Sequence, residues 1–172
     1  MRENFCEYFK IQLQKLVPFL LSLMFVFLEN IEPEFGLKLI QPMLGLSCVF
    51  FWSFNRPDIF GVFCVAALGA VSDILEYAPL GLFLFSFVLL QMIEMKIAWY
   101  ISNKIFVINW ATFGVLSLFI VSIQWFLASV SGERFLPFDD TFASWIVTVC
   151  LYPLIAAVIL KISNWLMSEN FE

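Results

Sequence analysis

Carboxylates are the side chains of this sequence that come nearest to forming a chemical site. Asp139 and Asp140 are its one adjacent aspartate pair, while Asp73 and Glu94 lie within apolar stretches. A metal-dependent phosphotransfer site would normally need a second aspartate-rich motif, and the sequence has none. The adjacent pair is therefore expected in a loop and at a helix N-cap, where aspartate favours the helix dipole. Asp73 and Glu94 are expected at different membrane depths, which does not suit a catalytic pair.

Other residues that support catalysis or metal binding are missing. Histidine is absent from all 172 residues, which removes the commonest general base and the commonest metal ligand. No two of the four cysteines have Cys-x-x-Cys spacing, so we expect small buried hydrophobes rather than a zinc or redox site. A glycine-rich phosphate loop is also missing. The sequence predicts no catalytic residue, no metal and no cofactor, and a membrane enzyme is the least favoured function.

The composition predicts an integral membrane protein. Hydrophobic residues make up 62% and charged residues 13% of the chain, and the mean hydropathy is +0.94, which excludes an ordinary soluble domain. Crossing a ~30 Å hydrocarbon core takes about 20 helical residues, and short polar breaks separate the apolar runs. We therefore expect a single all-α domain over residues 1–172, with short loops and six transmembrane helices at 12–29, 38–54, 57–75, 79–100, 105–130 and 140–164.

The basic residues predict the orientation of these helices. With the N-terminus in the cytoplasm, seven of the nine Lys and Arg residues fall inside, and only Lys38 and Arg134 fall outside. This bias follows the positive-inside rule. The chain enters the first span without a small-residue cleavage site, so this span is expected to be a retained anchor. Both termini are expected in the cytoplasm, with Trp52, Trp99 and Trp165 at the inner interface.

Small residues gather on one face of the expected helix 57–75. The spacing i, i+3, i+4, i+7 places on this face Ala66, Gly69, Ala70 and Asp73. Small residues let a second backbone approach closely in lipid, so we expect this helix to be packed centrally and the bulky helix 79–100 to face lipid over much of its surface. Asp73 is expected to pair with a neighbouring helix or a turn amide, with a ligand or partner contact as the alternative. Glu94 is expected to snorkel to the cytoplasmic interface near Lys96.

An ordered motif lies between about residues 52 and 82. It reads Arg-Pro-Asp-Ile-Phe-Gly over 56–61, Gly-Ala-Val-Ser-Asp-Ile-Leu over 69–75 and Pro-Leu-Gly-Leu over 79–82. This set resembles the MreD family of bacterial rod shape-determining membrane proteins, which shows R-P-x-x-x-G, G-x-x-x-D-x-L and P-L-G in this order. The chain departs from the family at 76–78, where Glu-Tyr-Ala stands in place of small residues such as Ser-Gly, and at Phe83, where many members have histidine.

The resemblance implies a non-enzymatic scaffold subunit of the cell-elongation machinery, which makes peptidoglycan and sets rod shape, in the bacterial inner membrane. MreD proteins bind MreC as their main partner and work with the actin-like MreB, the RodA glycosyltransferase and its partner transpeptidase. Membrane lipids are expected contacts and nucleic acid is not. The implied six-helix fold is similar to the substrate-binding subunits of energy-coupling-factor vitamin transporters. The candidates for partner binding or packing are Arg56, Pro57, Asp58, Gly61, Gly69, Asp73, Pro79 and Gly81.

A small-molecule-binding subunit of a membrane transporter is the alternative function. It would need a polar, aromatic-lined pocket that opens outward. The groups available for such a pocket are Trp125, Gln124, Asp73 and Glu32. An interfacial aromatic belt explains the same aromatic residues more simply, so the scaffold remains the leading prediction.

Overall fold

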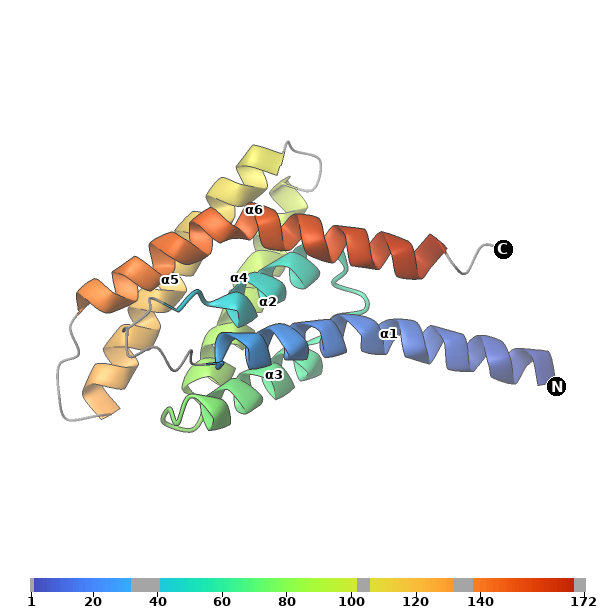
Figure 1. Cartoon of the computed structure of the whole chain (residues 1–172), viewed down its shortest axis with the longest axis horizontal. Coiled ribbons are helices and arrows are strands. Elements are labelled where there is room, and N and C mark those ends of the chain that lie inside the picture. Colours follow the sequence, from blue (N-terminus) through green and yellow to red (C-terminus); the bar gives the residue numbers. More distant parts are fainter. Residues whose placement is uncertain (1, 32–40, 102–105, 132–137, 169–172) are drawn as a thin grey trace.

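The protein is a bundle of helices (Figure 1). The computed structural model describes residues 2–31, 41–101, 106–131 and 138–168, and the side chains within 16–31, 41–97, 106–130 and 138–163. These residues hold six helices and no strand, which confirms the prediction of an all-α chain. The helices are α1 (Arg2–Glu29), α2 (Leu44–Asn55), α3 (Val62–Leu75), α4 (Leu82–Ile101), α5 (Phe106–Ser131) and α6 (Phe138–Ser168).

Two helices begin later than the prolines of the sequence suggested. Pro57 was expected at the start of a helix, but α3 begins five residues further on, at Val62. The Arg56 carbonyl accepts hydrogen bonds from the N–H groups of Ile59 and Phe60, both at 3.1 Å, so this segment is a turn. Similarly, the Pro79 carbonyl accepts a bond from the Leu82 N–H at 3.1 Å, and α4 begins there rather than at 79. In both places the proline belongs to the turn before the helix.

Two of the helices, α5 and α6, are long and apolar enough to cross a membrane. Phe106–Val130 and Phe138–Ser163 contain windows of mean hydropathy 2.0 and 2.2, of which 28% is buried inside the protein. In contrast, α2 and α3 have 12 and 14 residues, or about 18 and 21 Å of helix, and a hydrocarbon core is ~30 Å thick. Among the residues described, two helices are thus both long enough and apolar enough to cross a membrane, so six spans are not shown.

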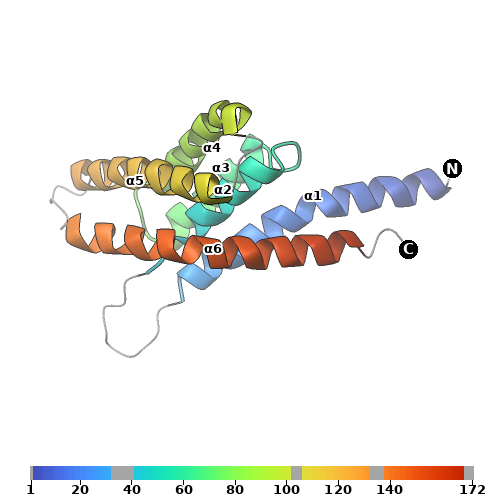
Figure 2. The ribbon, with the colours of Figure 1, turned by 90° about the horizontal axis from the view of Figure 1, so that it is seen from above.

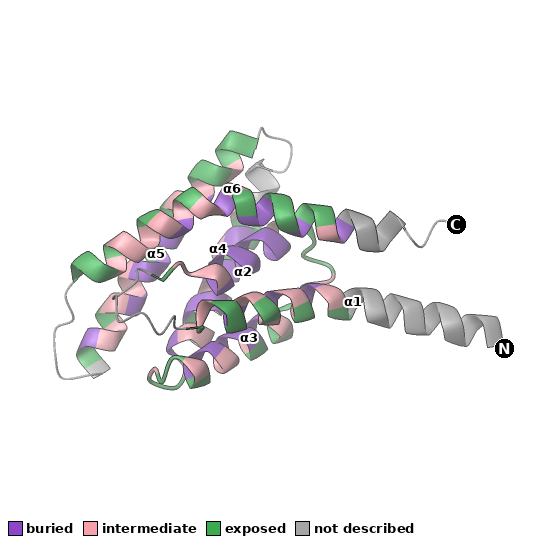
Figure 3. Cartoon of the chain, viewed as in Figure 1, coloured by how far each residue is buried: buried purple, intermediate pink, exposed green. Residues whose placement is uncertain are grey.

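The centre of the bundle is formed by α2 and α4. α4 packs against α2, α3 and α5, and α2 packs against α1, α4 and α6. Figure 2 shows α2 lying between α4, α5 and α6, and Figure 3 shows many buried residues on both helices. The prediction that 57–75 lies centrally while 79–100 faces lipid over much of its surface is therefore wrong about which helix is central. Leu82, Phe87 and Leu90 of α4 are buried between its neighbours, while Phe85, Met92 and Met95 face outward.

Aromatic rings fill the core where α2, α5 and α6 meet. Phe50, Phe113 and Tyr152 have ring centroids 4.2–5.6 Å apart, and all three are buried. Trp52 is buried as well, so it does not lie at an interface as expected. The N-terminal end of α1 and the C-terminal end of α6 project toward the same side of the molecule (Figures 1 and 2).

Candidate functional site

A close helix contact lies in the hairpin formed by α3, the turn 76–81 and α4. A Cβ added at Gly69 would lie 2.4 Å from Leu84 Cα and 2.7 Å from Leu84 N. Real Cβ atoms essentially never lie within 3.0 Å of other heavy atoms, so this contact requires glycine. The small face of α3 is thus occupied by α4 of the same chain.

Asp73 connects the end of α3 to the start of α4. Its side chain is 2% exposed. Oδ2 accepts a hydrogen bond from the Gly81 N–H at 2.8 Å, and Oδ1 accepts one from the Phe83 N–H at 2.7 Å. The first turn of a helix has free N–H donors and a positive dipole end, so the carboxylate satisfies both. Gly81 has φ +98°, a left-handed conformation that favours glycine.

A second carboxylate acts similarly at the same end of the bundle. Glu29, the last residue of α1, accepts a hydrogen bond through Oε2 from the Gly45 N–H in the first turn of α2, at 2.9 Å. The Met43 N–H donates to Thr148 Oγ1 of α6 at 2.8 Å. We call this region, where α1 and α3 end and α2 and α4 begin, the hairpin end of the molecule.

The motif residues from the sequence fall into two groups. Gly69, Asp73 and Gly81 meet in the hairpin, as described above. The others lie on the surface, and the Cβ position of Gly61 has nothing within 4 Å. The turn between α2 and α3, at the opposite end from Asp73, contains Arg56, Pro57, Asp58 and Gly61, and the turn before α4 contains Pro79.

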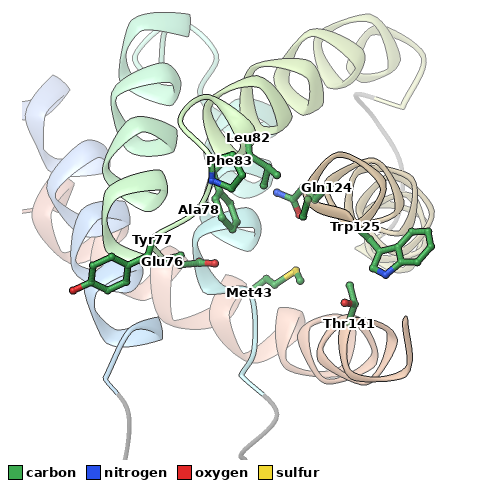
Figure 4. A pocket seen from close by; sticks show the side chains of 11 residues that line it. Met43, Glu76, Tyr77, Ala78, Leu82, Phe83, Gln124, Trp125 and Thr141 are labelled. Atoms are coloured by element: carbon green, nitrogen blue, oxygen red, sulfur yellow. The ribbon is translucent and has the colours of Figure 1, made fainter. Parts of the chain in front are cut away.

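A cavity of about 670 Å³ opens at the hairpin end (Figure 4). Its walls come from the turn 76–81, α4, α5, the start of α6 and the segment before α2. They comprise Met43, Glu76, Tyr77, Ala78, Pro79, Leu82, Phe83, Gln124, Trp125, Ala128 and Thr141. A second chamber of about 220 Å³ shares four of these walls and adds Glu29, Gln41, Asp140 and Ser144. The cavity falls within the usual size range of small-molecule sites, which is about 300–1,000 Å³.

Two polar side chains point into this cavity. Gln124 extends from α5 toward Leu82 and Phe83, and the carboxylate of Glu76 points toward Met43 (Figure 4). Gln124 is 6% exposed and forms no hydrogen bond with the part of the chain that the structure describes. Trp125 packs edge-on against Phe138, with ring centroids 5.3 Å apart. The cavity is therefore mostly apolar, with one amide and one carboxylate presented to an occupant.

Glu76 lies beyond the last residue of α3, at the mouth of the cavity. The residue as a whole is exposed, yet its carboxylate lies against the walls of both chambers. Removal from bulk water, and then the charge of Asp73, raise the pKa of Glu76 to about 7. Its charge is therefore titratable near neutral pH.

The cavity agrees only in part with the pocket that the sequence suggested. Trp125 and Gln124 do line it. Asp73 does not, because both of its oxygens are held by backbone amides, and Glu32 lies outside the described residues. Sequence reasoning missed Glu76 as a wall residue. The signal that could have found it was the Glu-Tyr-Ala departure from the family pattern in this turn.

A different polar cluster is buried toward the opposite end of α4. Glu94 is 1% exposed, so the prediction that it snorkels to an interface is wrong. Both carboxylate oxygens lack a hydrogen-bond partner among the described residues, as does Trp52 Nε1. Gln91 donates through Nε2 to the Phe60 carbonyl at 2.8 Å, but its Oε1 is unpaired within the same part of the structure. Lys96, two residues along, is exposed.

The described residues contain no group of three or more Cys, Asp or Glu side chains placed to hold a metal ion. What the site offers instead is a shaped cavity beside a rigid helix hairpin. Comparisons with known protein families, curated proteins and solved structures gave no match for this chain. The site is therefore interpreted from its own geometry.

Proposed function

We propose that this chain is a non-enzymatic, multi-pass membrane scaffold of the MreD type, which holds proteins of the bacterial cell-elongation machinery together. An MreC protein is the principal partner in this proposal, with MreB, RodA and its transpeptidase further along the assembly. All six helices would be embedded in the inner membrane, with both termini in the cytoplasm. No step of catalysis is assigned to it.

The observation that carries this proposal is the role of the motif in the hairpin. Gly69, Asp73 and Gly81 each meet one backbone requirement: a close helix contact, a helix cap and a left-handed turn. The motif residues therefore determine the structure of the hairpin and do not form a catalytic site. This supports a protein that presents a fixed surface to partners.

The exposed surface supports a membrane location. Large apolar side chains point outward from the helices, including Val115 on α5, which is 70% exposed, and Leu154 on α6, which is 65% exposed. Apolar surface of this extent needs lipid or protein to cover it. In the proposal, lipid covers most of it and partner helices cover the rest.

The outward face of α3 is the partner surface we propose. Phe63 and Ile74 are 92% and 65% exposed. They are eleven residues apart, about three turns, and so they lie on one side of the helix. This side is available because the glycine face of α3 is already covered by α4.

Co-purification tests this surface. The chain is expressed with the MreC protein of the same genome, and the double variant Phe63→Ser/Ile74→Ser is expected to recover several-fold less MreC at a normal level of scaffold. Val115→Ser on α5 is the matched control and should recover MreC normally. Absence of MreC from the wild-type complex would refute the proposal, and normal recovery with the double variant would remove this face of α3 from the interface.

The cavity favours a second candidate, the small-molecule-binding subunit of a transporter. An amide that is buried and has no hydrogen-bond partner among the described residues, in a space of about 670 Å³, is what a ligand site would present. Thermal-shift measurements with vitamin-like ligands test it, because a ligand that binds only the folded state stabilises it. Reproducible stabilisation by one compound supports this candidate, and no response to the series speaks against it.

A further inference from the structure

The cavity at the hairpin end combines features that select for one kind of ligand. Its body is apolar, with Met43, Leu82 and Phe83 among its walls. A ligand that fills such a space must bring a hydrocarbon or aromatic portion, since apolar walls are poorly satisfied by water alone.

The charged side chains among the described residues that line the cavity all have one sign. Glu76 lines both chambers, and Glu29 and Asp140 line the smaller one. No described lining residue is a lysine or an arginine. Glu29 has one oxygen held by the Gly45 N–H, which leaves the Glu76 carboxylate as the group that points into the larger space (Figure 4). A cationic ligand complements this wall, and an anionic one is repelled.

Gln124 provides an observation independent of the carboxylates. Its side chain is 94% buried and points into the cavity, yet forms no hydrogen bond with the described chain. A buried amide without partners destabilises a protein by its lost hydration. The amide can both donate and accept a hydrogen bond, so it fits a ligand that has a polar head and is not purely hydrocarbon.

The aromatic walls favour an organic ammonium group over a metal ion as the cation. Trp125 and Phe83 both line the larger space. Aromatic faces attract ammonium groups, and they do so best where water is partly excluded. Metal ions prefer several oxygen ligands instead, and the described residues hold no cluster that would supply them.

We propose that the space between Glu76, Gln124 and Trp125 binds an ammonium group that carries an apolar body. The ammonium lies against the Glu76 carboxylate and Phe83, and the apolar body lies against Leu82, Met43 and the wall formed by Trp125. Two sources supply this chemistry: the headgroup of phosphatidylethanolamine and a free amine. The inference does not depend on the scaffold proposal, because a scaffold and a transporter subunit are both compatible with it.

A matched pair of small probes tests the charge requirement. The full chain, purified in a non-ionic detergent at pH 8, is titrated with 2-phenylethylamine and with 2-phenylethanol, which has the same ring but no ammonium. Binding is read from tryptophan fluorescence and from the thermal midpoint. The amine is expected to bind and the alcohol is not. Equal binding of the two compounds overturns the proposal.

Variants locate the binding. Glu76→Gln removes the charge, and Gln124→Leu removes the amide while keeping its volume. Each is expected to weaken amine binding by about tenfold, because each removes a polar contact with the ligand. The controls are Asp58→Asn, at the opposite end of the molecule, and Phe126→Leu, on the exposed side of α5. Both controls should bind normally. Unchanged binding by Glu76→Gln and Gln124→Leu overturns the assignment to this cavity.

Lipid nanodiscs separate the two sources. The chain is exchanged into bilayers of phosphatidylethanolamine or of phosphatidylglycerol, and retained lipid is identified by native mass spectrometry. Selective retention of phosphatidylethanolamine, reduced in Glu76→Gln, identifies the lipid headgroup as the ligand. Amine binding without lipid retention identifies a free amine. Absence of both responses overturns the inference while leaving the MreC test unaffected.

Discussion

Asp73 and Glu94 are two carboxylates with nearly the same burial and opposite surroundings. They are 2% and 1% exposed, and both contact α4 or belong to it. Asp73 accepts two backbone hydrogen bonds at the first turn of α4, while Glu94, in the middle of that helix, accepts none from the described residues. The first turn of a helix has free N–H groups, whereas those of its interior are already bonded to carbonyls four residues earlier. A carboxylate beside the first turn of α4 therefore finds backbone donors, whereas a carboxylate within α4 finds none among the described residues.

This difference distinguishes the carboxylates at the hairpin end, which accept backbone hydrogen bonds, from Glu94 toward the other end of α4. At the hairpin end, Asp73 and Glu29 each join the end of one helix to the start of the next. Toward the other end of α4, Glu94 and Trp52 carry polar atoms that the described chain does not pair. The following predictions test how far the two ends differ.

The largest loss of stability is expected at the contact between α3 and α4 in the hairpin end. Gly69→Leu would force a side chain against the backbone of Leu84, so it should destabilise the fold by about 3 kcal/mol or more. Gly61→Leu, where a Cβ meets nothing within 4 Å, is the control and should change little. Unfolding in detergent by added sodium dodecyl sulfate measures both. Equal stability of the two variants would show that the α3–α4 contact is looser than described. Because Gly69→Leu alters the hairpin itself, it does not report on a partner surface.

The Asp73 cap should come next. Asp73→Ala leaves the N–H groups of Gly81 and Phe83 buried without an acceptor, and we expect a loss of about 3 kcal/mol in unfolding free energy. Asp73→Asn keeps one acceptor oxygen and should lose about half as much. The same titration measures both variants. A loss below about 0.5 kcal/mol for Asp73→Ala would contradict the cap.

Glu94 should respond in the opposite way. Glu94→Leu removes a buried carboxylate that has no described partner, so stability should rise or change by less than about 1 kcal/mol. If Glu94→Leu lost as much stability as Asp73→Ala, the contrast between the two carboxylates would be refuted. Glu94→Gln provides a second measurement, because it keeps the shape of the side chain and removes only the charge.

The smallest effect is a pH dependence at the mouth of the cavity. The pKa of Glu76 is raised to about 7 in the folded protein, so the folded state favours the protonated carboxyl, and this contribution to stability is lost as pH rises toward 7. Glu76→Gln should therefore raise the thermal midpoint at pH 8 and leave it nearly unchanged at pH 4. Asp58→Asn, at the opposite end, is the control. The carboxylates that face Glu76, on α1, α3 and α6, are Glu29, Asp73 and Asp140, and they are present in both proteins.

Much of the hairpin could be predicted from local spacing. Gly69 and Asp73 are four residues apart and so share a face of a helix whatever surrounds it. The sequence predicted that Asp73 pairs with a neighbouring helix or a turn amide, and the structure identifies two backbone amides as its partners. The burial of α4 could not be predicted this way, because Phe83 and Phe87 have the same hydropathy whether lipid or protein covers them. The prediction that Trp52 lies at the membrane interface was wrong for the same reason, because hydropathy does not show whether lipid or protein covers a side chain.

The sequence by itself determined the helical character of the chain and the faces on which small and acidic residues lie, because both follow from hydropathy and from 3.6 residues per turn. Only the tertiary structure decided which of those faces are covered, which carboxylate finds a donor, and that Glu76 and Gln124, 48 residues apart, point into one space. The physical reason is that periodicity is a property of one helix, while burial, pairing and cavities depend on which other helix lies opposite.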